Sequence, residues 1–112
     1  MKRTMSKSIP QLRRLHGRII YPVDVREVSV EEEIDGTTET HYSYFKVELE
    51  DRGDDLSDPA VFAKQRYADL RRLAPFPHGY GSKDEQLEMQ QEQGFTAWQD
   101  HCQQVKASFP KL

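Results

Sequence analysis

The feature that most restricts the fold is an Asp-Gly pair between two runs rich in β-branched and aromatic residues. Asp35-Gly36 separates residues 18–34 from residues 37–50. Asp-Gly readily adopts the positive φ angles of a tight hairpin turn, and β-branched and aromatic residues favour strands. The sequence therefore predicts an antiparallel β-hairpin over residues 18–50, with a polar tip that is exposed to solvent.

The register of this hairpin is constrained by its apolar residues. A turn of only two residues would place Asp24 opposite Val47. Because side chains alternate between the two faces of a strand, Val23 and Val25 would then lie on the face opposite to Val47. A bulge near residues 26–27, or a longer loop at the tip, would restore one apolar face. We expect one of these two irregularities.

A helix is predicted over residues 59–74. Asp58 is a favourable N-cap and Pro59 is suited to the first helical position, while Pro75 ends the segment. Residues at helical spacing form one stripe with small and aromatic neighbours beside it. The stripe contains Phe62, Arg66, Leu70 and Leu73, and its neighbours are Ala63, Tyr67 and Ala74.

A helical pair is predicted over residues 83–108. Ser82 and Glu85 have the spacing of a capping box, and Thr96 and Gln99 repeat this spacing. The first helix has little apolar surface, whereas the second carries an apolar stripe that is typical of a packed helix. That stripe consists of Trp98, Cys102, Val105 and Phe109.

Charge divides the chain unevenly. Residues 1–23 contain six basic and no acidic side chains, although the 112-residue chain has a formal net charge of −3. We expect residues 1–17 to be a basic, mobile arm, with one or two helical turns ending at Gly17. Residues 18–112 are expected to form one α+β domain, with the hairpin packed against two to three helices. The basic side chains are Lys2, Arg3, Lys7, Arg13, Arg14 and Arg18.

No residue pattern predicts catalysis, a cofactor or a metal site. His101 and Cys102 are adjacent and point about 100° apart on a helix, and no base is spaced to activate the single cysteine. The acidic residues 51–58 lack the ligand spacing of a calcium loop. We therefore expect a protein that is not an enzyme. Since no apolar run is long enough for a membrane span, we expect no membrane partner.

Nucleic-acid binding is an alternative to protein binding. Tyr42, Tyr44 and Phe45 offer aromatic surfaces for base stacking, and the basic arm offers phosphate contacts. The acidic remainder of the chain counts against this alternative. A second charged feature is a row of glutamates at helical spacing, which is either solvated or faces the basic surface of a partner or of the arm. These are Glu85, Glu88 and Glu92.

The last third of the chain carries a spaced pattern of residues. They are Tyr80, Ser82, Glu85-Gln86-Leu87-Glu88-Met89, Gly94, Trp98, Val105-Lys106 and Phe109-Pro110-Lys111. This pattern resembles a module of small proteins, and of the ends of longer ones, encoded in the tail gene regions of tailed bacteriophages and prophages. Gly81 departs from that family, in which proline is frequent at this position.

The resemblance implies a helical attachment or assembly element without catalytic residues. It implies a partner that is another phage or prophage structural or assembly protein, in the host cytoplasm or the virion. The alternative is a small nucleic-acid-binding accessory protein that acts through its arm. The residues expected to bind the partner are Lys2, Arg3, Lys7, Arg13, Arg14, Arg18, Tyr80, Gln86 and Met89.

Overall fold

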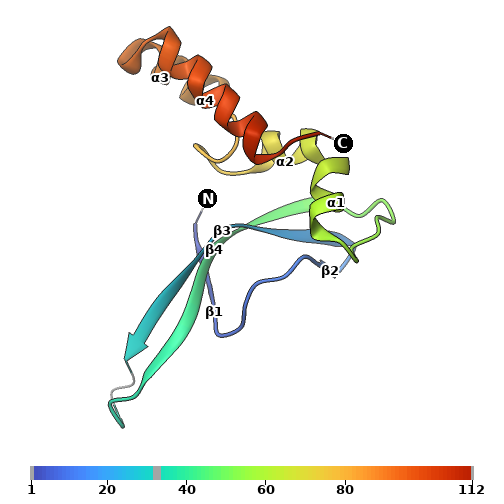
Figure 1. Cartoon of the computed structure of the whole chain (residues 1–112), viewed down its shortest axis with the longest axis vertical. Coiled ribbons are helices and arrows are strands. Elements are labelled where there is room, and N and C mark those ends of the chain that lie inside the picture. Colours follow the sequence, from blue (N-terminus) through green and yellow to red (C-terminus); the bar gives the residue numbers. More distant parts are fainter. Residues whose placement is uncertain (1, 32–33, 112) are drawn as a thin grey trace. The chain divides into compact units, whose positions relative to one another are not determined.

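The computed structural model describes residues 2–31 and 34–111. An antiparallel sheet and four helices lie within these residues, so the predicted α+β class is confirmed (Figure 1). The chain divides into two compact units, residues 1–50 and residues 51–112. The first is called the sheet unit and the second the helical unit, and each is described by itself.

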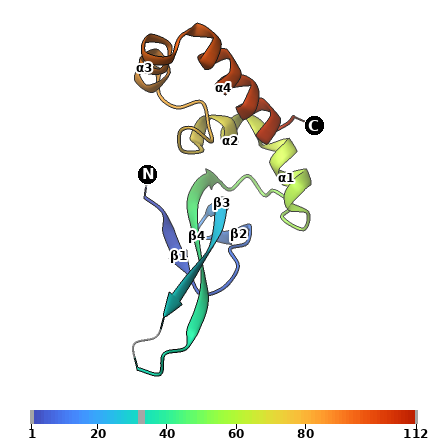
Figure 2. The same cartoon turned by 60° about the vertical axis from the view of Figure 1, so that its left-hand side comes forward.

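The sheet unit contains four antiparallel strands in the order β1-β4-β3-β2 (Figure 2). The predicted hairpin is confirmed as its central pair, and a short strand extends each side. The strands are β1 (Thr4–Ser6), β2 (Arg13–Leu15), β3 (Arg18–Glu31) and β4 (Thr38–Glu50). The edge strands β1 and β2 therefore lie in the segment that was expected to be an arm.

The prediction of helical turns that end at Gly17 is wrong. Leu15 pairs with Arg18 across a two-residue turn, in which His16 has φ 51° and Gly17 has φ 77°. Two successive positive φ angles match the right-handed twist of the adjoining strands. Gly17 thus belongs to a hairpin turn between β2 and β3 and does not end a helix.

Both register irregularities considered for the central hairpin are present. Glu31 pairs with Thr38, so more than two residues separate the last paired positions of the two strands. A bulge lies between Val23 and Arg26, slightly before the expected position. Together they place Val23 opposite Phe45 and bury it, whereas Val25 is 44% exposed, contrary to the prediction.

The sheet unit buries mainly the residues near the base of the hairpin. The buried apolar side chains are Ile19, Ile20, Val23, Tyr44, Val47 and Leu49. Towards the tip, Glu31 and residues 34–40 are exposed, as predicted for the described part of this segment. Glu32 and Glu33, which were also expected at the tip, lie outside the described residues.

The segment predicted as one helix is divided at Arg66 into α1 (Pro59–Gln65) and α2 (Tyr67–Leu73). Asp58 caps α1 as predicted, and its carboxylate accepts hydrogen bonds from the backbone N–H groups of the first turn. Arg66 has φ −105° and ψ 27°, which leaves the helical region and interrupts the ladder. Phe62 and Leu70 of the predicted stripe are fully buried.

The predicted helical pair is confirmed as α3 (Lys83–Gln93) and α4 (Phe95–Ser108). Ser82 and Glu85 form the expected capping box. The prediction of a second capping box at Thr96 and Gln99 is wrong, because α4 begins before Thr96. Gly94, with φ 95°, is the only residue between the two helices. Of the predicted stripe of α4, Val105 and Phe109 are buried, and His101 is buried as well.

Candidate functional site

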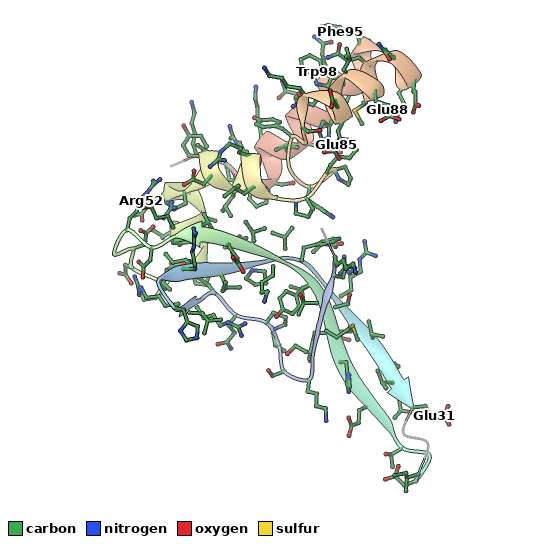
Figure 3. All side chains as sticks on the ribbon, turned by 180° about the vertical axis from the view of Figure 1, so that it is seen from behind. Glu31, Arg52, Glu85, Glu88, Phe95 and Trp98 are labelled. Carbon is green, nitrogen blue, oxygen red and sulfur yellow. The ribbon has the colours of Figure 1, made fainter. Side chains whose placement is uncertain are left out.

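The described surface of α3 contains a small hollow with an apolar floor and an acidic rim. Its volume is about 150 Å³. Met89 and Phe76 form the floor, and α3 supplies the charged groups around it. The full lining is Phe76, Glu85, Glu88, Met89, Glu92 and Gln93. We call it the α3 hollow, and Figure 3 shows Glu85 and Glu88 on this part of the helical unit.

The segment between α2 and α3, residues 74–82, is called the connector. The aromatic floor of the α3 hollow depends on a close approach between Phe76 of this connector and Gly81, just before α3. Gly81 has φ 85°, and a Cβ atom there would lie 2.7 Å from a ring carbon of Phe76. Proline, whose φ is held near −65°, cannot adopt this conformation. The backbone conformation thus gives a physical reason for glycine at position 81.

Buried His101 of α4 holds the connector in place. Its ring lies 5.0 Å from the ring of Phe76, measured between centroids, and its Nε2 atom is 3.1 Å from the carbonyl oxygen of Tyr80. Since a carbonyl oxygen can only accept, Nε2 carries the proton and donates it. The backbone N–H of Tyr80 donates in turn to the carbonyl of Arg71. These contacts fix Phe76 relative to α3 and α4.

The three glutamates of the α3 hollow have different local roles. The Glu85 carboxylate accepts a hydrogen bond from the backbone N–H of Ser82, and it lies in the first turn, where the helix dipole favours an anion. Glu88 and Glu92 are exposed and four residues apart, a spacing at which like charges repel by about 0.2–0.5 kcal/mol. Glu92 also lies in the last turn, which contains no basic residue. Glu88 and Glu92 therefore oppose helix stability.

Among the residues expected to bind a partner, Met89 is the one that lines the α3 hollow. Gln86 instead connects the two helices: its side chain accepts from the indole Nε1–H of Trp98 at 3.1 Å and donates to the carbonyl of Gly81. The backbone of Tyr80 is held by α2 and α4, as described above. Gln86 and Tyr80 thus have structural contacts beside the hollow, and Met89 is the one of the three that lines it.

An aromatic pair lies at the start of α4, with Phe95 exposed and Trp98 half-buried. Phe95 is 58% exposed, and its ring centroid lies 5.3 Å from that of Trp98 (Figure 3). Trp98 is the only tryptophan in the chain. Because its indole is bonded to Gln86, one turn of α3 before Met89 and Gln90, its fluorescence can report on changes near the α3 hollow.

Arg3, one of the six basic residues, is used inside the sheet unit. Its guanidinium donates to the Ser43 hydroxyl at 2.6 Å and forms an ion pair with Asp24 at 2.9 Å. It also lies 4.5 Å from the ring centroid of Phe45. Asp24, which has φ 54° in the bulge, is shared with Arg26. Arg3 therefore ties the first strand to the bulge and is poorly placed to bind a partner.

The other five basic residues expected at the site are exposed. They are Lys2, Lys7, Arg13, Arg14 and Arg18. Arg18 pairs in register with Glu50, so an acidic residue lies directly across the strands from it. The strand pairing thus places one acidic residue, Glu50, beside the end of the basic segment.

A second cluster of charges in the helical unit is almost fully enclosed. Arg66 contacts the carboxylates of Asp54 and Asp69, each at 2.9 Å, and its side chain is 7% exposed. Burial alone would raise the pKa of Asp69, but hydrogen bonds from Arg66 and Arg72 and the charges of Arg66 and Arg52 lower it. Burial likewise disfavours charged Arg66, yet the two carboxylates raise its pKa. Sequence reasoning placed Arg66 on the helical stripe but missed these partners.

His, Cys, Asp and Glu side chains are the groups that could hold a metal ion, and Cys102 is the candidate thiol nucleophile. Within residues 2–31 and 34–111, no three His, Cys, Asp or Glu side chains are arranged to hold a metal ion. Burial raises the pKa of the Cys102 thiol, and the nearby charge of Lys106 does not reverse this. A thiol that stays protonated is a weak nucleophile. In the same residues no helix has both the length and the apolarity to cross a membrane.

Comparisons of the sequence with models of known protein families, with curated proteins and with solved structures find no match. The role of the α3 hollow must therefore be inferred from its own residues. It is too small and too shallow for most ligand-sized molecules, since pockets for such ligands measure about 300–1,000 Å³.

Proposed function

We propose that this chain is a non-enzymatic accessory protein of a tailed bacteriophage or prophage, and that it binds another structural or assembly protein of the tail region. The observation that carries the proposal is that α3 is an ordered, capped helix that buries none of its residues. Most helices in small proteins are stabilised by packing an apolar face. A helix without such a face is well suited to bind a partner.

The resemblance to phage tail-region modules supports the kind of partner. Its residues span 80–111, which contain α3, α4 and the turn before them. The protein would act in the host cytoplasm during assembly, and it would remain in the virion if the complex persists. No cofactor is required for such a role.

The test is a pull-down with the full chain as bait and the products of its neighbouring genes expressed in the same host, with and without nuclease. Capture of an identified tail or assembly protein that resists nuclease supports the proposal. Removal of residues 1–17 is a poor control, because it deletes β1 and β2. Replacing exposed Lys2, Lys7 and Arg13 by serine keeps Arg3 and the strands in place.

Nucleic-acid binding is the second candidate, favoured by the exposed basic side chains near the sheet edge. It is weakened by Arg3, which is paired with Asp24, and by Arg18, which faces Glu50. Anisotropy of labelled DNA and RNA across a salt series tests it, since phosphate contacts give a steep salt dependence. Salt-sensitive binding that disappears in the triple serine variant would favour this function over the first.

A further inference from the structure

We infer that the α3 hollow is a docking site for a basic amphipathic helix of a partner protein. Lysine or arginine side chains of that helix would pair with Glu88 and Glu92, and one aliphatic side chain would enter between Met89 and Phe76. This inference rests on the proposed function only in taking the partner to be a protein. It specifies the chemistry that the partner presents.

Charge indicates a cationic partner. Glu88 and Glu92 are exposed, and neither forms an ion pair among residues 2–31 and 34–111. They repel each other at four-residue spacing, and Glu92 meets the negative end of the helix dipole. A cation placed between them removes both unfavourable interactions at once. Glu85 is excluded from this role because its carboxylate already caps the helix.

Size indicates a single side chain as the apolar anchor. The α3 hollow measures about 150 Å³, and its floor is formed by Met89 and Phe76. This is below the range of ligand pockets, about 300–1,000 Å³. Methionine is flexible and adapts its shape to an incoming aliphatic group. The hollow can therefore accept a leucine- or methionine-sized group and is too small for a cofactor.

The dimensions of α3 fit a helical partner. Its 11 residues span about 16 Å at 1.5 Å per residue. Residues at positions i and i+4 of a partner helix lie on one face with the same spacing as Glu88 and Glu92. A helix that lies along α3 can thus pair with both glutamates and still direct an aliphatic residue into the hollow. This is the helix-in-groove mode of recognition.

The probe is a synthetic helical peptide of about 18 residues, long enough for roughly five turns. It carries lysines at i and i+4, a leucine stripe and no tryptophan or tyrosine, and it is labelled for fluorescence anisotropy. Saturable binding to the full chain is expected, accompanied by a change in Trp98 fluorescence. A peptide of equal charge in which serine replaces leucine is expected to bind on the order of tenfold more weakly.

The decisive variant is the double substitution Glu88→Lys and Glu92→Lys, which is expected to weaken binding on the order of tenfold or more. The matched control is Glu27→Lys with Glu31→Lys, which makes the same charge change at exposed positions of the sheet unit. Circular dichroism confirms that both variants keep their helices. The inference is overturned if no peptide binding is seen, if both double variants weaken it equally, or if the serine peptide binds as well as the leucine peptide.

Failure of this inference is distinguishable from failure of the proposed function. If a tail protein is captured and the α3 variant captures it equally well, the function stands and the docking site is wrong. If the peptide binds as expected but no tail protein is captured, the docking chemistry stands and the phage assignment is wrong.

Discussion

Two groups of acidic side chains in the helical unit differ in their surroundings. Asp54 and Asp69 converge on Arg66, and the Arg66 and Asp54 side chains are less than a tenth exposed. Glu88 and Glu92 lie exposed on α3, and no ion pair involves them within the described residues. Sequence alone shows both groups as acidic. The difference shows that the fold pairs the first group internally and leaves the second exposed to solvent.

The largest loss of stability is expected when Arg66, the cation between Asp54 and Asp69, is removed. Arg66→Ala leaves Asp54 and Asp69 without their main partner, and breaking a buried pair in this way costs about 3–5 kcal/mol. Urea denaturation measures the loss. Arg72→Ala is the matched control, because Arg72 also contacts Asp69 but is 69% exposed, and a loss below about 1 kcal/mol is expected. Equal losses in the two variants would remove the distinction between the groups.

The next largest effect is expected from Asp69, whose contribution to stability should depend on pH. The pKa of Asp69 is lower in the folded state than in the unfolded state, so its stabilisation is complete above the unfolded pKa, about 3.9. It is lost as the pH falls through the folded pKa. Asp69→Asn should therefore lower the free energy of unfolding at neutral pH by about 1.5–3 kcal/mol. The difference from the parent protein should shrink in acid.

Glu92→Gln serves as the control at neutral pH. Because Glu92 is exposed and forms no ion pair within the described residues, this change should alter the free energy of unfolding by no more than about 0.5 kcal/mol. A strong change in this control would mean that α3 also uses its carboxylates for folding.

A smaller effect is expected in the sheet unit, where Asp24 is a third paired acid. Arg3→Ala removes hydrogen bonds to Ser43 and Asp24, but Arg26 still compensates Asp24. A loss of about 1–2 kcal/mol is expected, with faster hydrogen exchange of the amides that join β1 to β4. Lys2→Ala, at an exposed neighbouring position, should change neither. An unaltered exchange rate in the Arg3 variant would contradict the role of this contact.

The smallest expected effect is a gain in stability. Glu92→Lys removes a like-charge pair, creates a favourable pair with Glu88, and places a cation in the last turn of α3. Stability should rise by about 0.5 kcal/mol, measured by thermal unfolding of the parent and variant proteins together. A decrease of more than 1 kcal/mol would show that the carboxylate has a structural role.

Local signals in the sequence were sufficient for several elements. Asp58-Pro59 marked the start of α1, and Ser82 with Glu85 marked the start of α3, because each cap acts within three residues of itself. The central hairpin was likewise visible from its alternation and its Asp-Gly pair. In each case the residues that decide the structure are neighbours along the chain.

Contacts between distant residues were not predictable in this way. Arg3 contacts Asp24 in the bulge and Ser43, which are 21 and 40 residues away. His16-Gly17 fits both a helix end and a hairpin turn, and only pairing with β3 decides between them. At Arg66, where the predicted helix is divided, the side chain bonds to Asp54, which precedes it by 12 residues.

The candidate site was predicted in part. The glutamate row was predicted from its helical spacing, whereas Met89 was expected at the site through the resemblance of residues 80–111. Phe76 was not placed beneath them, because its position depends on the positive φ of Gly81 and on contact with His101. The glutamates of the rim come from one helix, so their spacing in the sequence predicts that they lie together. The floor combines Met89 of α3 with Phe76 of the preceding segment, and the sequence does not predict that contact.

The edge position of β1 has a consequence for the order in which the sheet unit forms during translation. Thr4–Ser6 pair with Tyr42–Tyr44, so a strand that is synthesised early must wait for nearly the whole unit to leave the ribosome. The tight turn between β2 and β3 needs no such delay, since its partners are adjacent. The nascent chain can therefore pair β2 with β3 early. In contrast, β1 is synthesised before the other strands of the unit but is the last to find its partner, β4.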